Sequence, residues 1–155
     1  MWGIANLRVR AAGAAFLLAA TAIGSLAAGK DATIDELKAR VAAASPPERP
    51  ALCIEISERE LDDADKLYAA GDNDKAQASL VDVVAFSELA RDYSIQAHKH
   101  EKQSEIAIRK MTRKLADIKR GVAFTEQKPL QDAIDKLQRI RDDLLFAMFP
   151  KGGRK

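Results

Sequence analysis

The sequence predicts an all-α protein: an elongated antiparallel helical hairpin or three-helix bundle, with a very long central helix and a short N-terminal helix, after a signal peptide. Small or apolar residues recur every seven positions across residues 76–118, which keeps them on one face only in a helix. No Gly or Pro interrupts residues 74–119, so an unbroken helix there would be roughly 70 Å long at about 1.5 Å per residue. Turn-forming residues cluster before it, at 45–50 and 71–74.

The first 27 residues are predicted to be a signal peptide that directs export to the periplasm or out of the cell. Two arginines precede an apolar run at residues 11–29, and Ser25 and Ala27 are small residues of the kind that a signal peptidase inspects. We expect cleavage after Ala27, with Gly29 as the second choice. The alternative is an uncleaved membrane anchor, because the run is close to the roughly 17–20 residues that cross a bilayer.

The charge of the processed chain is balanced overall but unevenly distributed. The full chain holds 25 Lys and Arg against 23 Asp and Glu, and removal of the signal peptide takes away two arginines and no acid. Residues 51–90 carry ten acids against three bases, whereas residues 91–120 carry nine bases against four acids. Such opposed blocks can attract one another within a homo-oligomer, or attract a charged partner.

Residues 28–50 are predicted to form a short helix and a proline-rich linker. Thr33 and Glu36 have the spacing of a capping box, in which each side chain accepts a hydrogen bond from the other residue's backbone N–H. The three prolines at positions 46–50 end this helix because they remove amide donors. The last of them, Pro50, is acceptable in the first turn of the next helix.

The predicted bundle domain, residues 51–149, begins with a helix that runs to about Ala70 and ends in a tight turn. Gly71 suits the left-handed residue that stops a helix, and Asp72 or Asn73 suits the cap of the next one. Because the turn is so short, the two helices must be antiparallel neighbours. The single Cys53 is predicted to be a small buried hydrophobe, the alternative being an intermolecular disulfide.

A distinct pattern of residues surrounds this turn: Ala64, Tyr68-Ala69-Ala70-Gly71-Asp72, Ala76 and Leu80. It resembles the turn and second helix of a tetratricopeptide repeat, and also the Gly-Asp-x-x-Ala hairpins of small helical envelope proteins of bacteria. The similarity covers about twenty residues and occurs once, whereas a repeat array needs about three copies. The resemblance implies hairpin geometry and a tendency to bind protein, with no ligand residue.

The C-terminal part is predicted to contain a loop at residues 124–129 and a last helix from Leu130. The apolar positions of this helix recur at helical spacing and are Leu130, Ile134, Leu137, Leu144 and Met148. We expect it to pack antiparallel on residues 108–122. Residues 150–155 are predicted to be a basic tail without structure.

The predicted partner-binding surface is a basic ridge on the long helix. It consists of Arg109, Lys110, Arg113, Lys114, Lys119 and Arg120. Export and the absence of interleaved aromatic residues argue against nucleic acid as the partner. A protein or an anionic envelope component is expected instead.

No catalytic apparatus is recognisable, so the protein is predicted not to be an enzyme and to need no cofactor. The serines lie inside predicted helices without an elbow turn. No metal site is expected, because a closed site requires more ligands than any segment of the sequence places on one helix face. The nearest candidates for metal ligands are His98, Glu101 and Glu105. The sequence favours a non-enzymatic scaffold or adaptor of the bacterial cell envelope, and the alternative is a small-ligand or metal sensor using residues 98–105.

Overall fold

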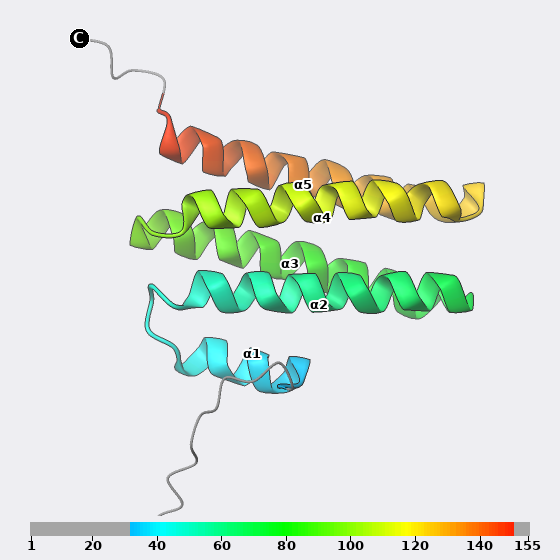
Figure 1. Cartoon of the computed structure of the whole chain (residues 1–155), viewed down its shortest axis with the longest axis horizontal. Helices are drawn as coiled ribbons and strands as arrows, with labels where there is room; N and C mark the ends of the chain where they lie inside the picture. The colour runs from blue at the N-terminus through cyan, green and yellow to red at the C-terminus, as the bar shows by residue number, and fades with distance from the viewer. Residues whose placement is uncertain (1–31, 151–155) are drawn as a thin grey trace, which may run out of the picture.

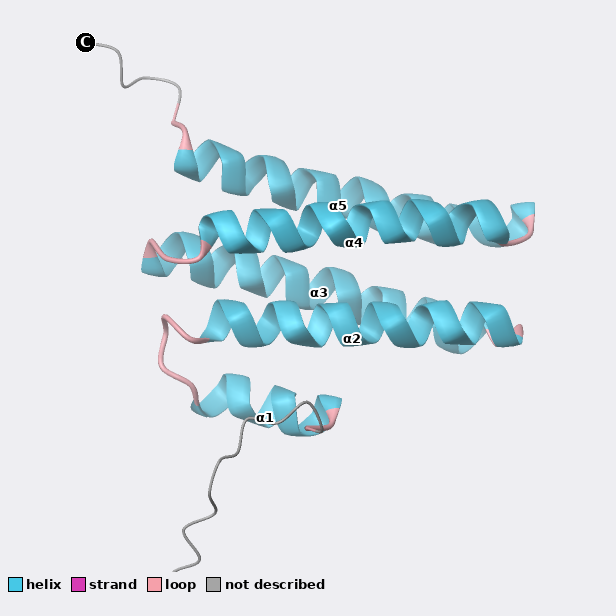
Figure 2. Ribbon diagram, in the orientation of Figure 1, coloured by secondary structure: helices cyan, strands magenta, loops and turns pink. Residues whose placement is uncertain are grey.

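The computed structural model describes residues 32–150; the predicted signal peptide and the tail beyond Pro150 lie outside the described residues. This part of the chain is built from helices and short connections, without strands (Figure 2). Its elements, in order, are α1 (Ile34–Ala43), α2 (Arg49–Ala70), α3 (Asn73–Ala97), α4 (Glu101–Gly121), the 3-10 turn η1 (Phe124–Glu126) and α5 (Gln127–Met148). The prediction of an all-α fold is confirmed.

Local sequence signals fix the first two helices. The Thr33 hydroxyl accepts from the Glu36 amide at 3.2 Å, and the Glu36 carboxylate accepts from the Thr33 amide at 2.8 Å, which forms the predicted capping box. After the linker, α2 begins at Arg49 with Pro50 in its first turn. It ends at Gly71, whose φ of 78° is left-handed as expected.

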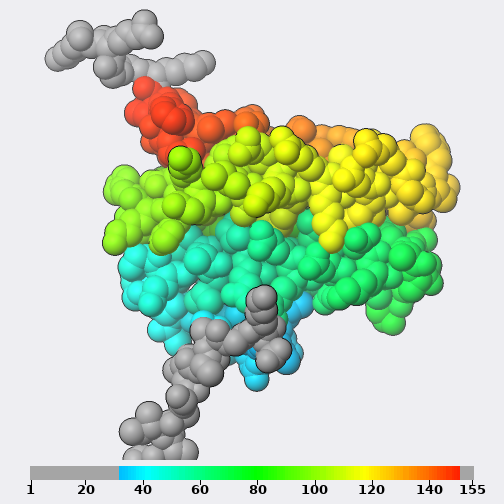
Figure 3. Space-filling view, in the orientation of Figure 1, coloured from blue at the N-terminus to red at the C-terminus, as the bar shows by residue number. Residues whose placement is uncertain are grey.

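Helices α2 to α5 form two antiparallel hairpins that lie side by side (Figures 1 and 3). In the first hairpin α2 packs on α3, and in the second α4 packs on α5, as predicted for the last helix. Between the hairpins, α2 lies beside α4 and α3 beside α5, each pair running in the same direction. The connection from α3 to α4 therefore crosses the bundle diagonally. Helix α1 packs on the outside of α2.

The prediction of one very long central helix is wrong, because the chain reverses at residues 98–100. His98 ends α3 and His100 precedes α4, with φ values of 49° and 66°. At 100° per residue, the buried row of α4 is rotated by roughly a quarter turn from that of α3. A straight helix would send the two rows toward different sides, whereas a reversal lets both face one core.

The number of helices and the start of the last one also differ from the prediction. Four long helices make the bundle, where a hairpin or three-helix bundle was expected. The predicted loop at residues 124–129 is helical throughout, since η1 covers residues 124–126 and α5 begins at Gln127. Pro129 falls in the first turn of α5, where a missing amide donor breaks no helical hydrogen bond.

The core consists of one large apolar cluster and one small one. The large cluster runs through α2 to α5 and includes Leu61, Ile108, Leu115 and Leu137, each at most 2% exposed. The small cluster lies under α1, where Leu37 and Val41 pack with Cys53, Ile56 and Ala90. The burial of Cys53 confirms its prediction as a small core residue.

Candidate interaction surface

The six basic residues of the predicted ridge lie on α4, but their side chains point in different directions. Helix α4 buries Ile108, Met111 and Leu115 against the rest of the bundle. Residues on either side of this buried row face different neighbours, because only positions three or four apart share a helix face. Lys114 accordingly faces α2, and Lys119 faces α5.

Lys114 joins the two hairpins through carboxylates of α2. Its Nζ lies 2.6 Å from Asp62 Oδ1 and 3.3 Å from Asp65 Oδ2. The hydrogen bond with Asp62 is the main cause that raises the pKa of Lys114. The positive charge of Lys114 is thus largely neutralised within the chain.

Lys119 and Arg120 also have partners within the chain. Lys119 Nζ donates to Gln131 Oε1 of α5 at 2.5 Å. The Arg120 guanidinium pairs with Asp117 one turn earlier on the same helix. This second pair is largely exposed, so its contribution to stability is small.

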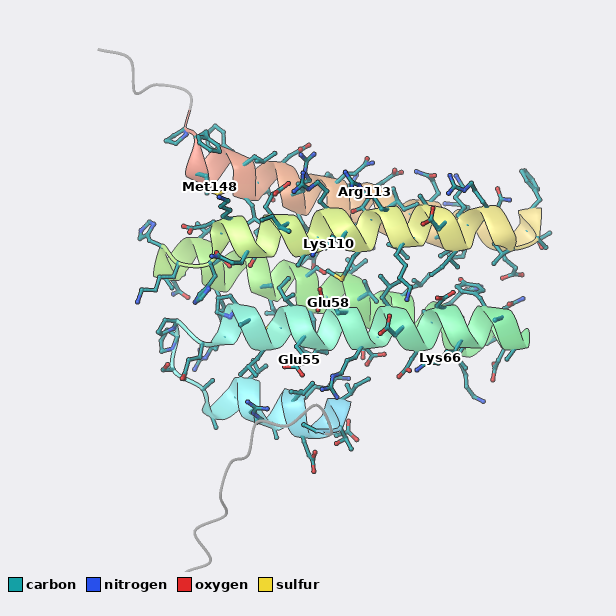
Figure 4. All side chains as sticks on the ribbon, in the orientation of Figure 1. Glu55, Glu58, Lys66, Lys110, Arg113 and Met148 are labelled. Carbon is teal, nitrogen blue, oxygen red and sulfur yellow. The ribbon has the colours of Figure 1, made fainter. Side chains whose placement is uncertain are left out.

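The remaining three cations of the ridge form a compact exposed group, which we call the α4 basic face: Arg109, Lys110 and Arg113. Among residues 32–150, neither Lys110 nor Arg113 has a carboxylate within ion-pair distance, and Arg109 Nε lies 3.6 Å from Glu105. Lys110 and Glu58 occupy facing positions of α4 and α2 (Figure 4). Burial raises the pKa of Glu58, and the charge of Lys110 opposes that shift.

A partly buried ion pair behind the α4 basic face fixes α4 against α5. Glu105 is only 7% exposed, and its Oε1 accepts from Arg141 Nε at 2.7 Å. Nearby, the buried hydroxyls of Ser94 and Ser104 share a hydrogen bond of 2.9 Å. Sequence reasoning missed both contacts, since their members lie on different helices and form no local motif.

The three candidate metal ligands do not converge. His98 lies in the turn after α3, Glu101 is the first residue of α4, and Glu105 is held by Arg141. Within residues 32–150, no group of three or more His, Cys, Asp or Glu side chains is placed to hold a metal ion.

The turn after α2 has a structural role. Gly71 supplies the left-handed residue, and Ala76, which is fully buried, allows α2 and α3 to approach closely. Asp72 occupies the predicted cap position but makes no side-chain cap; its carboxylate accepts instead from Lys75 Nζ at 2.7 Å. The hydrogen bond with Lys75 lowers the pKa of Asp72.

A cluster of charges that the sequence did not reveal holds α1 on the first hairpin. Lys38 Nζ lies 2.8 Å from Asp82 Oδ2 and 3.5 Å from Glu60 Oε1, and 5.3 Å from the centroid of the Phe86 ring. The hydrogen bond with Asp82 raises the pKa of Lys38. Burial, followed by the charge of Asp82, raises the pKa of Glu60.

Cys53, Ser57 and Ser87 of the first hairpin are buried in the core. Burial raises the pKa of the Cys53 thiol to about 11, so the reactive thiolate is scarce at neutral pH. The Ser57 hydroxyl donates to the Val83 carbonyl at 3.2 Å, and the Ser87 hydroxyl donates to Ser57 at 3.3 Å. These bonds join α2 to α3 in the core and place no hydroxyl beside a base.

Residues 32–150 form a small helical bundle. No family model matches it, and no curated protein or solved structure shows significant similarity to it. None of the helices in residues 32–150 has the length and apolar character needed to cross a bilayer.

Proposed function

We propose that the protein is a non-enzymatic scaffold or adaptor of the bacterial cell envelope that binds an acidic segment of a partner protein through the α4 basic face. The observation that carries the proposal is the contrast within the predicted ridge. Lys114 and Lys119 are bonded to Asp62 of α2 and Gln131 of α5, and Arg120 is paired with Asp117. Lys110 and Arg113 are exposed and have no carboxylate within ion-pair distance among residues 32–150, and Arg109, also exposed, lies 3.6 Å from Glu105 on the same turn of helix.

The fixed backbone of α4 favours a specific partner. Glu105 is bonded to Arg141, and Lys114 is bonded to α2, so α4 is fixed on both sides of the α4 basic face. Because the backbone that carries the three cations is already ordered, binding of a carboxylate costs only the conformational entropy of the side chains. Acidic residues such as Glu58 and Asp117 border the surface, which favours a shaped acidic segment of protein over a uniformly anionic lipid surface.

The envelope location rests on the predicted signal peptide. Arginines followed by an apolar run and small residues at 25 and 27 are typical of exported precursors. Fractionation of the producing cells, followed by N-terminal sequencing of the protein, tests it. We expect a chain that begins at Ala28 in the periplasm or the medium, and recovery of an intact N-terminus in the cytosol would refute the location.

Partner binding is tested by crosslinking and pull-down from the envelope fraction with matched charge reversals. The test variant replaces the three residues of the α4 basic face by Glu. The control variant carries the same change of charge at exposed cations of α2 and α5: Lys66, Lys136 and Arg139. We expect the test variant to lose the partner, the control to keep it, and binding to weaken at about 0.5 M salt, where charges are screened beyond about 4–5 Å.

Two results would contradict this proposal. One is equal loss of the partner by both variants, because net charge alone would then explain binding. The other is binding to anionic lipid vesicles that only the test variant loses, which would replace the acidic protein by a lipid surface. Circular dichroism of both variants verifies that the bundle is intact.

A further inference from the structure

The turn between α3 and α4 adopts a conformation that no helix-breaking residue imposes. His98 and His100 both have left-handed backbones, and they are the only residues other than glycine with positive φ in the described chain. A side chain with a Cβ is strained in this conformation. The side chain of His100 forms no cap on α4, and the sequence lacks Gly and Pro here. Within the turn, the His98 and Lys99 amides donate to the carbonyls of Ile95 and Ser94. These bonds end α3 but do not by themselves bring α4 back onto the bundle, so packing of the two hairpins must hold the turn closed.

The contacts that hold it closed join the two hairpins and do not depend on the turn itself. Lys114 of α4 reaches Asp62 of α2, and Arg91 Nη1 of α3 lies 2.8 Å from Asp143 Oδ2 of α5. The apolar core likewise runs across both hairpins. All of these contacts are equally available when the second hairpin comes from another copy of the chain.

We propose that residues 98–100 are a hinge at which two copies of this protein exchange their α4–α5 hairpins. In the exchanged dimer, residues 73–121 of each chain form one continuous helix of roughly 70 Å at about 1.5 Å per residue. The dimer keeps the contacts between hairpins, relieves the two left-handed histidines and adds helical hydrogen bonds through the former turn. Short hinges under strain are the usual site of such exchange.

The sequence of the hinge region supports a helical alternative. Residues 74–119 contain no Gly or Pro, so no residue in this region prevents a continuous helix. The exchange concerns self-association and is independent of the α4 basic face. The partner that it implies is a second copy of the chain.

Substitutions at the hinge should shift the monomer–dimer equilibrium in opposite directions. Glycine tolerates the left-handed conformation and weakens a continuous helix, so His98→Gly or His100→Gly should favour the monomer. Each glycine substitution should change the equilibrium between the closed turn and the continuous helix by roughly tenfold per hinge. Because the dimer contains two hinges, its dissociation constant should rise on the order of 100-fold. His98→Ala and His100→Ala, which favour helix without relieving the turn, should lower it.

A disulfide between α3 and α4 distinguishes exchange from any other dimer. Ser94 and Ser104 have their hydroxyls 2.9 Å apart, so the Ser94→Cys/Ser104→Cys variant can form a disulfide, in a Cys53→Ala background. The full chain is unfolded in urea and refolded at high protein concentration. Monomer and dimer are then separated by size exclusion, oxidised and run on a non-reducing gel.

The expected result is an intrachain disulfide in the monomer and a covalently linked pair of chains in the dimer. The glycine variants should reduce the dimer peak and the alanine variants should increase it. The proposal is overturned if refolding yields no dimer at any concentration, or if the dimer contains only intrachain disulfides, because the chains would then associate without exchange.

Discussion

Two glycines of the bundle should respond in opposite ways to the same substitution, Gly→Ala. Gly71 sits in the turn after α2 with a φ of 78°, and a Cβ added there would meet no atom within 4 Å. Gly121 is the last residue of α4, and its backbone is not left-handed. A Cβ added at Gly121 would also meet no atom within 4 Å. Steric overlap is absent at both sites, so the backbone conformation alone distinguishes them.

The magnitudes follow from this difference. Alanine in the left-handed region is disfavoured by roughly 1–2 kcal/mol, partly offset by the reduced entropy of the unfolded chain. Gly71→Ala should therefore lower the free energy of unfolding by about 1 kcal/mol. At Gly121, alanine has the better helix propensity and the same effect on the unfolded chain, so Gly121→Ala should raise that free energy by about 0.5–1 kcal/mol.

Urea denaturation followed by circular dichroism at 25 °C measures both changes. The slope of free energy against urea should be the same in all three proteins, since neither substitution alters the buried surface. Gly71→Asn serves as a control, because Asn tolerates the left-handed region better than Ala and should be less destabilising. A neutral or stabilising Gly71→Ala, or a shift of both alanine variants in the same direction, would show that backbone conformation does not distinguish the two glycines.

Three further predictions concern buried polar groups. Tyr68→Phe should stabilise the protein by about 1 kcal/mol, because the buried Tyr68 hydroxyl has no hydrogen-bond partner among residues 32–150; a lower urea midpoint would contradict this. Cys53, whose thiol pKa is raised to about 11 by burial, should react with iodoacetamide at pH 8 at least about tenfold more slowly in the folded protein than in urea; equal rates would contradict its burial. Because burial raises the pKa of Glu60, the folded protein retains this proton at pH values where the unfolded chain has lost it. The contribution of Glu60 to the free energy of unfolding therefore falls as pH rises from the ordinary glutamate pKa of the unfolded chain to the raised pKa of the folded protein. Glu60→Gln should flatten this decline in urea midpoints between pH 4 and 8, and an unchanged profile would count against the burial of its charge.

Elements with a local chemical signal could be predicted closely from the sequence. Thr33 and Glu36 mark the start of α1 because both partners of the capping box lie within four residues. Gly71 marks the end of α2 because few other residues adopt its conformation easily. In both cases the signal and the structure that it forms lie in the same stretch of chain.

The reversal between α3 and α4 lacked such a signal. Neither His98 nor His100 is a strong turn residue, and the seven-residue pattern continues through them. The buried rows of α3 and α4 lie about a quarter turn apart, but this rotation shows only that the two halves of a straight helix would face different directions. The reversal is decided by packing of the second hairpin on the first, which involves residues about fifty positions apart, such as Asp62 and Lys114.

The candidate surface also depends on contacts between residues that are far apart in the sequence. The cluster of basic residues on one helix was evident from spacing, but which of them remain exposed depends on acids and amides contributed by α2 and α5. Glu105, one of the nearest candidates for a metal ligand, accepts a hydrogen bond from Arg141, which lies thirty-six residues later in the chain. Lys38 and Asp82 are likewise separated by 44 positions.

The most direct test of the folded arrangement is the distance between the start of α3 and the end of α4. Nitroxide labels at Asp74→Cys and Arg120→Cys, both exposed sites, are measured by pulsed electron paramagnetic resonance in the monomeric fraction of a Cys53→Ala protein. Because α3 and α4 reverse direction and lie across one bundle, we expect about 15–25 Å, from helix spacings of 8–10 Å and the reach of the labels. A single population near 70 Å in the monomer, the length of an unbroken helix at about 1.5 Å per residue, would contradict the two-hairpin bundle.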